Sequence, residues 1–193
     1  MKSAIKMMLL LSCFGLSQFT FAQGSISYGL NGEFAIPIGD FGDAANLGFG
    51  GTGTIQMQTT DNFFLFLRSG YIRWGGKDIN VFGVNVSSNY SAIPIMGGGA
   101  IYLGSENPRV YLFGELGVHV FKASAESNFL DPITGNLQTA SASSTETEFS
   151  AAPGIGVIFG EETQVSIAGR FNYVTDKLSY IGFRIGILFG REE

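Results

Sequence analysis

The chain has 193 residues, of which 45% are hydrophobic and only 14% are charged, a composition that fits one folded domain and excludes a disordered chain. Its net charge of -5 gives no attraction for the phosphates of nucleic acid. No apolar run reaches the ~18 to 20 residues of a membrane-spanning helix, so any insertion into a membrane has to use strands. One histidine and one cysteine are too few for a transition-metal site, and we expect neither a metal nor a cofactor.

The N-terminal segment has the features of an export signal. Lys2 and Lys6 precede a mostly apolar stretch over residues 7–16, and the small residues that a signal peptidase reads end at Ala22. We therefore expect a cleaved signal peptide over residues 1–22, followed by a single β-barrel domain over residues 23–193.

The only cysteine, Cys13, lies inside this segment, so the processed chain would contain no thiol and no disulfide. A competing interpretation takes residues 10–13 as a lipoprotein box in which Cys13 is acylated. It would leave an apolar core of only residues 7–11, which is shorter than the roughly 7 residues that a signal needs. The cleaved signal peptide is therefore favoured.

The rest of the chain alternates between large apolar and small or polar residues, with a period of two. This period predicts strands that have one oily face and one polar face. Each strand has the ~9 to 11 residues needed to cross a bilayer obliquely. The predicted strands cover about residues 26–36, 47–58, 63–74, 90–103, 109–121, 148–159, 164–173 and 180–189.

The connections between these strands alternate in length. A loop is predicted at 39–43, a long loop that could hold a hairpin at 75–89, and the longest irregular stretch at 122–147. Tight turns or short links are predicted at 59–62, 104–108, 160–162 and 175–177. Short turns at one end and long loops at the other are typical of barrels in the outer membrane. The pattern thus predicts an all-β fold, an antiparallel eight-stranded up-and-down transmembrane β-barrel.

The charges indicate which face is oily. The predicted outward faces carry no charge at membrane depth, and Arg73 falls at a strand end, where it can snorkel to the interface. A water-soluble barrel of the lipocalin kind would need a charged exterior instead. Five charged residues fall on the inward faces: Glu33, Arg68, Glu115, Arg170 and Arg184. Since an unpaired buried charge costs several kcal/mol, we expect the two glutamates to pair with some of the arginines and to plug the barrel.

Aromatic residues near the strand ends suit the two interfacial girdles of a membrane barrel, although strand propensity alone explains any single one of them. The residues expected in the girdles are Tyr71, Trp74, Tyr102, Phe121, Tyr173 and Phe189.

The last predicted strand resembles the C-terminal assembly signal of outer-membrane barrels. In that signal an aromatic or polar residue is followed by a glycine and then by alternating apolar residues that end in Phe. The matching residues are Tyr180, Gly182, Ile185, Ile187 and Phe189, with a short tail after the final Phe.

As a whole, the chain resembles the family of small outer-membrane β-barrel domains of the OmpA and OmpX type. Short motifs carry the resemblance, at residues 37–42, 69–71, 92–95 and 115–117. It implies an integral protein of the outer membrane without a shared catalytic site, surrounded by outer-membrane lipid and lipopolysaccharide and inserted by the barrel assembly machinery. We expect a monomer.

Three functions follow from this resemblance. The leading hypothesis is a non-enzymatic barrel that supports envelope integrity or presents residues 122–147 to an extracellular partner. The second is a narrow porin that passes small solutes or ions and whose interior arginines make an anion-preferring constriction. The third, least favoured, is a lipid-A-modifying hydrolase that uses His119.

Other patterns are weak. Residues 48–53 spell a dinucleotide-binding G-x-G-x-x-G, but no helical pattern follows, so strand packing explains the glycines better. Asp40 and Asp43 could bind calcium, although two carboxylates three residues apart are more often a solvated turn.

Overall fold

The computed structural model describes residues 25–77, 79–81, 84–130, 137–160, 163–176 and 178–190, and the side chains of these residues outside 79–86 and 128–138. The predicted signal peptide at 1–22 lies outside the described residues. So do the tip of the predicted loop at 122–147 and most of the turn at 160–162.

The described chain is made of strands and one short helix. Their bounds are β1 Ile26–Pro37, α2 Gly39–Ala44, β2 Ala45–Thr60, β3 Phe63–Gly76, β4 Ile79–Val81, β5 Val84–Leu103, β6 Arg109–Leu130, β7 Leu137–Phe159, β8 Gln164–Val174 and β9 Tyr180–Phe189. No helix among the described residues is long and apolar enough to cross a membrane.

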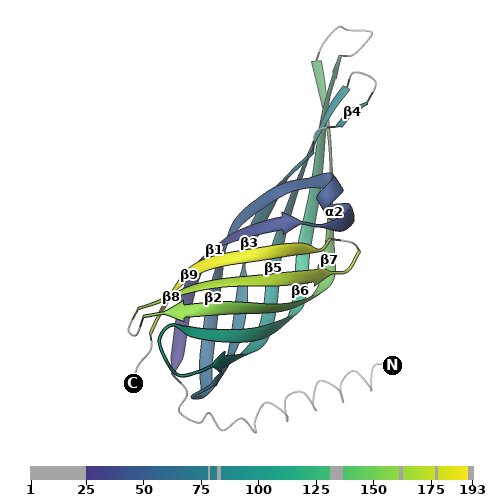
Figure 1. The fold of residues 1–193 in the computed structure, drawn as a ribbon. Coiled ribbons are helices and arrows are strands. Elements are labelled where there is room, and N and C mark those ends of the chain that lie inside the picture. Colours follow the sequence, from purple (N-terminus) through teal and green to yellow (C-terminus); the bar gives the residue numbers. More distant parts are fainter. Residues whose placement is uncertain are drawn as a thin grey trace, which may run out of the picture.

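The strands close into a barrel. Each strand pairs antiparallel with its neighbours in the order β3-β2-β1-β9-β8-β7-β6-β5, and a β3–β5 pairing joins the two ends of this order. β4 stands outside the ring and pairs only with the start of β5. The predicted all-β, antiparallel eight-stranded up-and-down barrel is therefore confirmed, as is the small hairpin inside residues 75–89 (Figure 1).

Alternate residues of each ring strand point to the outside and to the inside of the barrel, as the period of two in the sequence predicts. On β1 and β3 the side chains of Leu30 and Leu67 are 70% and 66% exposed, whereas the neighbouring Glu33 and Arg68 are 2% exposed. Large apolar side chains on the outer faces of the other ring strands complete an apolar belt around the barrel. The belt has the character of a lipid-facing wall, because a soluble protein rarely exposes so large an apolar surface.

The prediction of an irregular loop at 122–147 is wrong. β6 and β7 instead continue beyond the ring as paired strands, from Lys122 opposite Thr145 to Leu130 opposite Leu137. We call this part, residues 122–130 and 137–147, the long hairpin; it rises past the other strands in Figure 1. Its Ser, Thr and Ala side chains have no oily face, so the period of two that marks a half-buried strand was missing from the sequence.

The predicted loop at 39–43 holds a helical turn, α2, that lies at the same end of the barrel as the long hairpin (Figure 1). Gly39 begins it with φ +59, a conformation that favours glycine. The turn places the side chain of Phe41 inside the mouth, where its ring contacts Trp74, Tyr90 and Phe121 at centroid distances of 5.4, 5.6 and 6.0 Å. α2 therefore forms a lid on the barrel.

The barrel interior is filled in three levels. The level next to the short turns is aromatic and includes Phe64, Phe66, Tyr102, Tyr111 and Phe113. The level next to the long hairpin lies under the lid and includes Ile72, Trp74, Phe121, Val174 and Tyr180. The charged side chains occupy the level between them.

The prediction of aromatic girdles is wrong for three of its six residues. Tyr71, Tyr173 and Phe189 do point outward, but Trp74, Tyr102 and Phe121 are buried inside the barrel. The physical reason is strand parity. Trp74, for example, is an even number of residues from the inward Arg68, so both side chains share a face.

Candidate functional site

The candidate site is the charged layer across the middle of the barrel. It is made of Glu33 on β1, Arg68 on β3, Glu115 on β6, Arg170 on β8 and Arg184 on β9, so the structure brings together all five residues that the sequence placed inside. The ion-paired side chains have no solvent exposure except that of Arg184, which is 7% exposed.

Arg68 is the centre of the layer. Its Nη2 and Nε donate to Glu115 Oε2 and Oε1 at 2.5 and 3.3 Å, a bidentate pair across the lumen. Its Nη1 donates to Glu33 Oε1 at 3.4 Å, and the Thr52 hydroxyl donates to the same oxygen at 2.7 Å. One guanidinium thus connects both carboxylates.

Arg170 and Arg184 complete the layer from the opposite wall. Arg170 Nη2 donates to Glu33 Oε2 at 2.8 Å, and Arg170 Nε donates to Asn172 Oδ1 at 3.3 Å. Arg184 is held more loosely: Nη1 lies 3.6 Å from Glu115 Oε1, and Nη2 donates to the Tyr111 hydroxyl at 3.4 Å.

Three arginines against two glutamates leave one positive charge in excess within this layer. The aromatic level beside it stabilises that charge through cation–π contacts. The Arg184 guanidinium lies 5.1 Å from the ring centre of Phe113 and 5.9 Å from that of Phe66. A cavity of about 10 Å³ beside Arg184 has room for one water molecule. The layer is a network of buried, ion-paired side chains.

His119 lies inside the barrel, one level above the charged layer. Its Nε2 is 2.8 Å from the Tyr180 hydroxyl, its ring stacks on Phe121, and the residue has no solvent exposure. The hydrolase hypothesis needs this histidine at a lipid-facing rim, where a substrate could reach it. The structure places it instead among core aromatics.

The glycine motif at residues 48–53 lies within β2 and has a packing role. A Cβ added at Gly48 would overlap the Trp74 indole, and one added at Gly50 would overlap the backbone at Tyr71 and Ile72 of the neighbouring strand. These contacts agree with strand packing rather than nucleotide binding.

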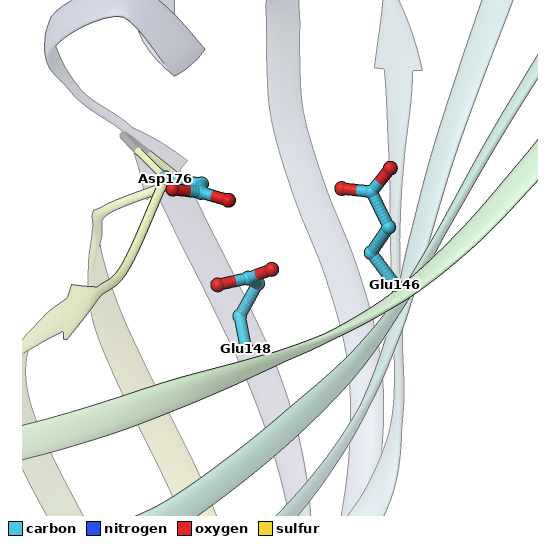
Figure 2. Close-up of side chains that lie close together, drawn as sticks. All are labelled: Glu146, Glu148 and Asp176. Atoms are coloured by element: carbon cyan, nitrogen blue, oxygen red, sulfur yellow. The ribbon is translucent and has the colours of Figure 1, made fainter.

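Three acidic residues, which we call the acidic rim, lie at the end of the barrel from which the long hairpin extends. Glu146 and Glu148 on β7 and Asp176 in the turn before β9 have carboxylate oxygens within 4.8 Å of one another (Figure 2). The hydroxyls of Thr175 and Ser144 donate to Glu148 and Glu146. Glu146 and Asp176 are exposed and Glu148 is half-buried, and such groups of acidic side chains are common on protein surfaces, so we treat the rim as an acidic surface. Asp40 and Asp43 belong to no such group among the described residues.

The comparison with known protein families decides where this barrel belongs. The sequence model of the outer membrane protein β-barrel domain matches residues 7–187. The chain belongs to this family.

Three solved structures illustrate what this outer-membrane barrel is similar to. The attachment invasion locus protein Ail of Yersinia pestis is 17% identical, covers 86% of this chain and 97% of its own, and has a TM-score of 0.49. Neisserial surface protein A is 13% identical with the same coverage and TM-score. The N-terminal barrel of Pseudomonas aeruginosa OprF is 16% identical, covers 86% and 100%, and has a TM-score of 0.39. No match was found among curated proteins.

Membership of the family predicts how the barrel is oriented in the outer membrane. Outer-membrane barrels have short turns on the periplasmic side and longer segments outside, so we expect α2, the long hairpin and the acidic rim to face the exterior. The charged layer lies at membrane depth, because exposed apolar residues surround it on the outer wall.

We expect this outer-membrane barrel to be electrically silent. The chain without residues 1–22, refolded into a planar bilayer, should give no stable conductance steps, because two levels of apolar and aromatic side chains and an ion-paired layer lie inside an eight-stranded barrel. A heat-dependent gel shift should first show that the barrel has formed. Steps whose size scales with salt concentration would contradict this expectation and would support the porin alternative.

The sequence missed two parts of the site. Asn172 and Tyr111 bond to the arginines, and their parity with Arg170 and with Glu115 was the available clue. The acidic rim could not have been found from spacing, because Asp176 is far in sequence from Glu146 and Glu148 and the fold alone brings them together.

Proposed function

We propose that the protein is a non-enzymatic surface protein of the outer membrane, which uses a rigid closed barrel to hold the long hairpin outside the cell for contact with an external partner. The observation that carries this proposal is an open edge on β7. β8 pairs with β7 only as far as Ser150, opposite Val174, whereas β6 pairs with β7 up to Leu137. Within the described residues, no strand pairs with the second edge of β7 beyond Ser150.

The direction of the backbone groups on this edge follows from one hydrogen bond. The Phe149 carbonyl accepts from the Thr175 amide at 3.0 Å, so Phe149 faces the β8 side. The β6–β7 pairing continues without a register shift, and therefore Thr147, Thr145 and Ser143 face the same side with their N–H and C=O groups. An extended peptide could add to the sheet along this edge.

The surroundings of the edge indicate the chemistry of such a peptide. A groove of about 310 Å³ lies between β5 and the long hairpin, and mostly small side chains line it: Ser88, Tyr90, Ala123, Ser124, Ala125, Ala142, Ser143 and Ser144. The acidic rim stands at the foot of the edge, where Glu146 and Glu148 are carried by β7 itself. We therefore expect an extended segment that carries Lys or Arg next to small or β-branched residues.

The other features have supporting roles in this proposal. The charged layer is a structural plug that fixes the strands around it. The last strand is the segment that the barrel assembly machinery reads, residues 1–22 are the export signal that is removed, and the barrel works as a monomer in outer-membrane lipid and lipopolysaccharide.

Proline on the open edge tests the proposal. Peptides selected from a random library on the wild-type barrel in nanodiscs should bind Thr145→Pro about tenfold more weakly, because proline removes an edge N–H and its ring blocks approach. Thr145→Val is the matched control: it changes the same side chain, keeps the N–H, and should bind as the wild type does. Equal binding by Thr145→Pro and Thr145→Val would contradict strand addition.

Trimming the long hairpin gives a second measurement. Phe121 pairs with Glu146, so residues 122–145, which carry Ser143 and Thr145 of the open edge, can be replaced by an Asn-Gly turn without changing the register below. The shortened barrel should keep its heat-dependent gel shift and lose all selected peptides. A shortened barrel that still binds them would place the contact elsewhere.

A further inference from the structure

A row of polar residues crosses three neighbouring strands on the outer wall of the barrel. In the sheet register Arg73 on β3 is opposite Ser91 on β5, and Ser91 is opposite Lys122 on β6. Side chains of residues directly opposite in a sheet point to the same face, so these three stand side by side on the outside.

This row lies directly above the apolar belt. Two residues below it on β3 and β5 are Tyr71 and Ile93, which are 50% and 43% exposed on the lipid-facing wall. Ile93 is in turn opposite Val120, two residues before Lys122. Arg73 and Lys122 are thus the first outward charges on their strands where the wall leaves the hydrocarbon on the exterior side.

Both cations are free for a ligand. Among the described residues neither Arg73 nor Lys122 forms an ion pair. Arg73 Nη2 donates to Asn89 Oδ1 at 3.2 Å, and this bond orients the guanidinium while leaving it further N–H groups. The carboxylate on the same face of β6 is Glu126, four residues further from the membrane, so it does not stand between them.

The spacing suits one anion held by two cations. One strand separates β3 from β6, so the Cα atoms of Arg73 and Lys122 are roughly 10 Å apart. Two long side chains can converge over the Ser91 hydroxyl from that distance, the guanidinium binding oxygen pairs bidentately and the ammonium acting as a point charge.

We propose that Arg73, Ser91 and Lys122 form a binding site for a phosphate group of a lipid in the outer leaflet, whose acyl chains lie along the belt at Tyr71 and Ile93. The position of the row gives the source of the phosphate. A lipid phosphate sits at this depth by necessity, with its chains beside an exposed apolar wall, whereas a soluble phosphate gains nothing from that wall.

The test measures which lipids the barrel retains. The mature wild-type protein is refolded in a nonionic detergent and titrated with bis-phosphorylated lipid A, with dephosphorylated lipid A and with inorganic phosphate, and bound molecules are counted by native mass spectrometry. We expect the phosphorylated lipid to bind at least about tenfold more tightly than the dephosphorylated lipid and more weakly as salt rises.

Single substitutions locate the site. Arg73→Gln and Lys122→Gln should each lower the affinity for the phosphorylated lipid about fivefold and leave the dephosphorylated lipid unaffected. Arg109→Gln is the matched control, because it removes one positive charge at the opposite end of the barrel, where Arg109 lies over the Tyr102 ring, and it should change nothing. All variants should keep the heat-dependent gel shift.

Three results would overturn the proposal. Equal affinity for the two lipids would show that Arg73 and Lys122 are solvated and do not bind the lipid phosphate. An equal loss in Arg109→Gln would show a general effect of net charge. Displacement of the lipid by inorganic phosphate at concentrations similar to those of the lipid would show that the site recognises the free anion rather than a lipid.

Discussion

Replacing Glu115 with alanine should lower the free energy of unfolding by about 3–5 kcal/mol, because it leaves buried arginine charge without its partner. Glu115 holds Arg68 with two hydrogen bonds and also faces Arg184. After its removal Arg68 keeps only the Glu33 contact at 3.4 Å. Unfolding in urea from lipid vesicles, followed by the fluorescence of the single tryptophan, measures the change.

Two further variants test the cause of this loss. Arg184→Ala should cost clearly less than Glu115→Ala, because Arg184 makes the longest ion pair of the layer and its removal leaves two arginines facing two glutamates. Glu126→Ala, on the exposed long hairpin, should lie within about 0.5 kcal/mol of the wild type. If Glu115→Ala unfolded at the same urea concentration as Glu126→Ala, the charged layer would have no stabilising role.

Replacing Phe41 with alanine should also destabilise the barrel strongly, by about 3–5 kcal/mol. The Phe41 ring is the part of the α2 lid that enters the mouth, and it meets three aromatic rings edge-on. Its loss leaves a cavity over Trp74 that opens toward the exterior. Urea unfolding measures the stability, and the Trp74 emission of the folded protein should shift to longer wavelength as water enters.

Phe34→Ala is the control for this prediction. Phe34 is 44% exposed on the outer wall, so lipid chains can fill the space that its side chain leaves. We expect less than half of the loss seen in Phe41→Ala and no change in the Trp74 emission. A Phe41→Ala variant that matched Phe34→Ala in both measurements would mean that α2 is a surface loop and not a lid.

Trp74 and Phe121 lie inside the barrel, although the sequence analysis placed them in the interfacial girdles. The clue to the interior position of Trp74 and Phe121 was present, because each shares parity with a charged inward residue, Arg68 or Glu115. Parity is the stronger rule, since a strand has only two faces, whereas aromatic side chains suit both a lipid interface and a packed lumen.

The pairing within the charged layer shows a different limit. In the sheet Glu33 is directly opposite Arg184, which is the pair that register alone would favour. The carboxylate instead binds Arg170 and Arg68. Partners that meet across the lumen depend on barrel closure and on the reach of each side chain, and neither is encoded in local spacing.

The sequence by itself determined the number of ring strands, which face of each is oily, and which charges lie inside, because the solvent on each side of a barrel wall acts on every second residue. Only the tertiary structure decided the ion-pair partners, the lid made by Phe41, the length of the long hairpin with its open edge, and the row of Arg73, Ser91 and Lys122. These features arise between segments far apart in the chain, and their geometry exists only once the strands have paired and the barrel has closed.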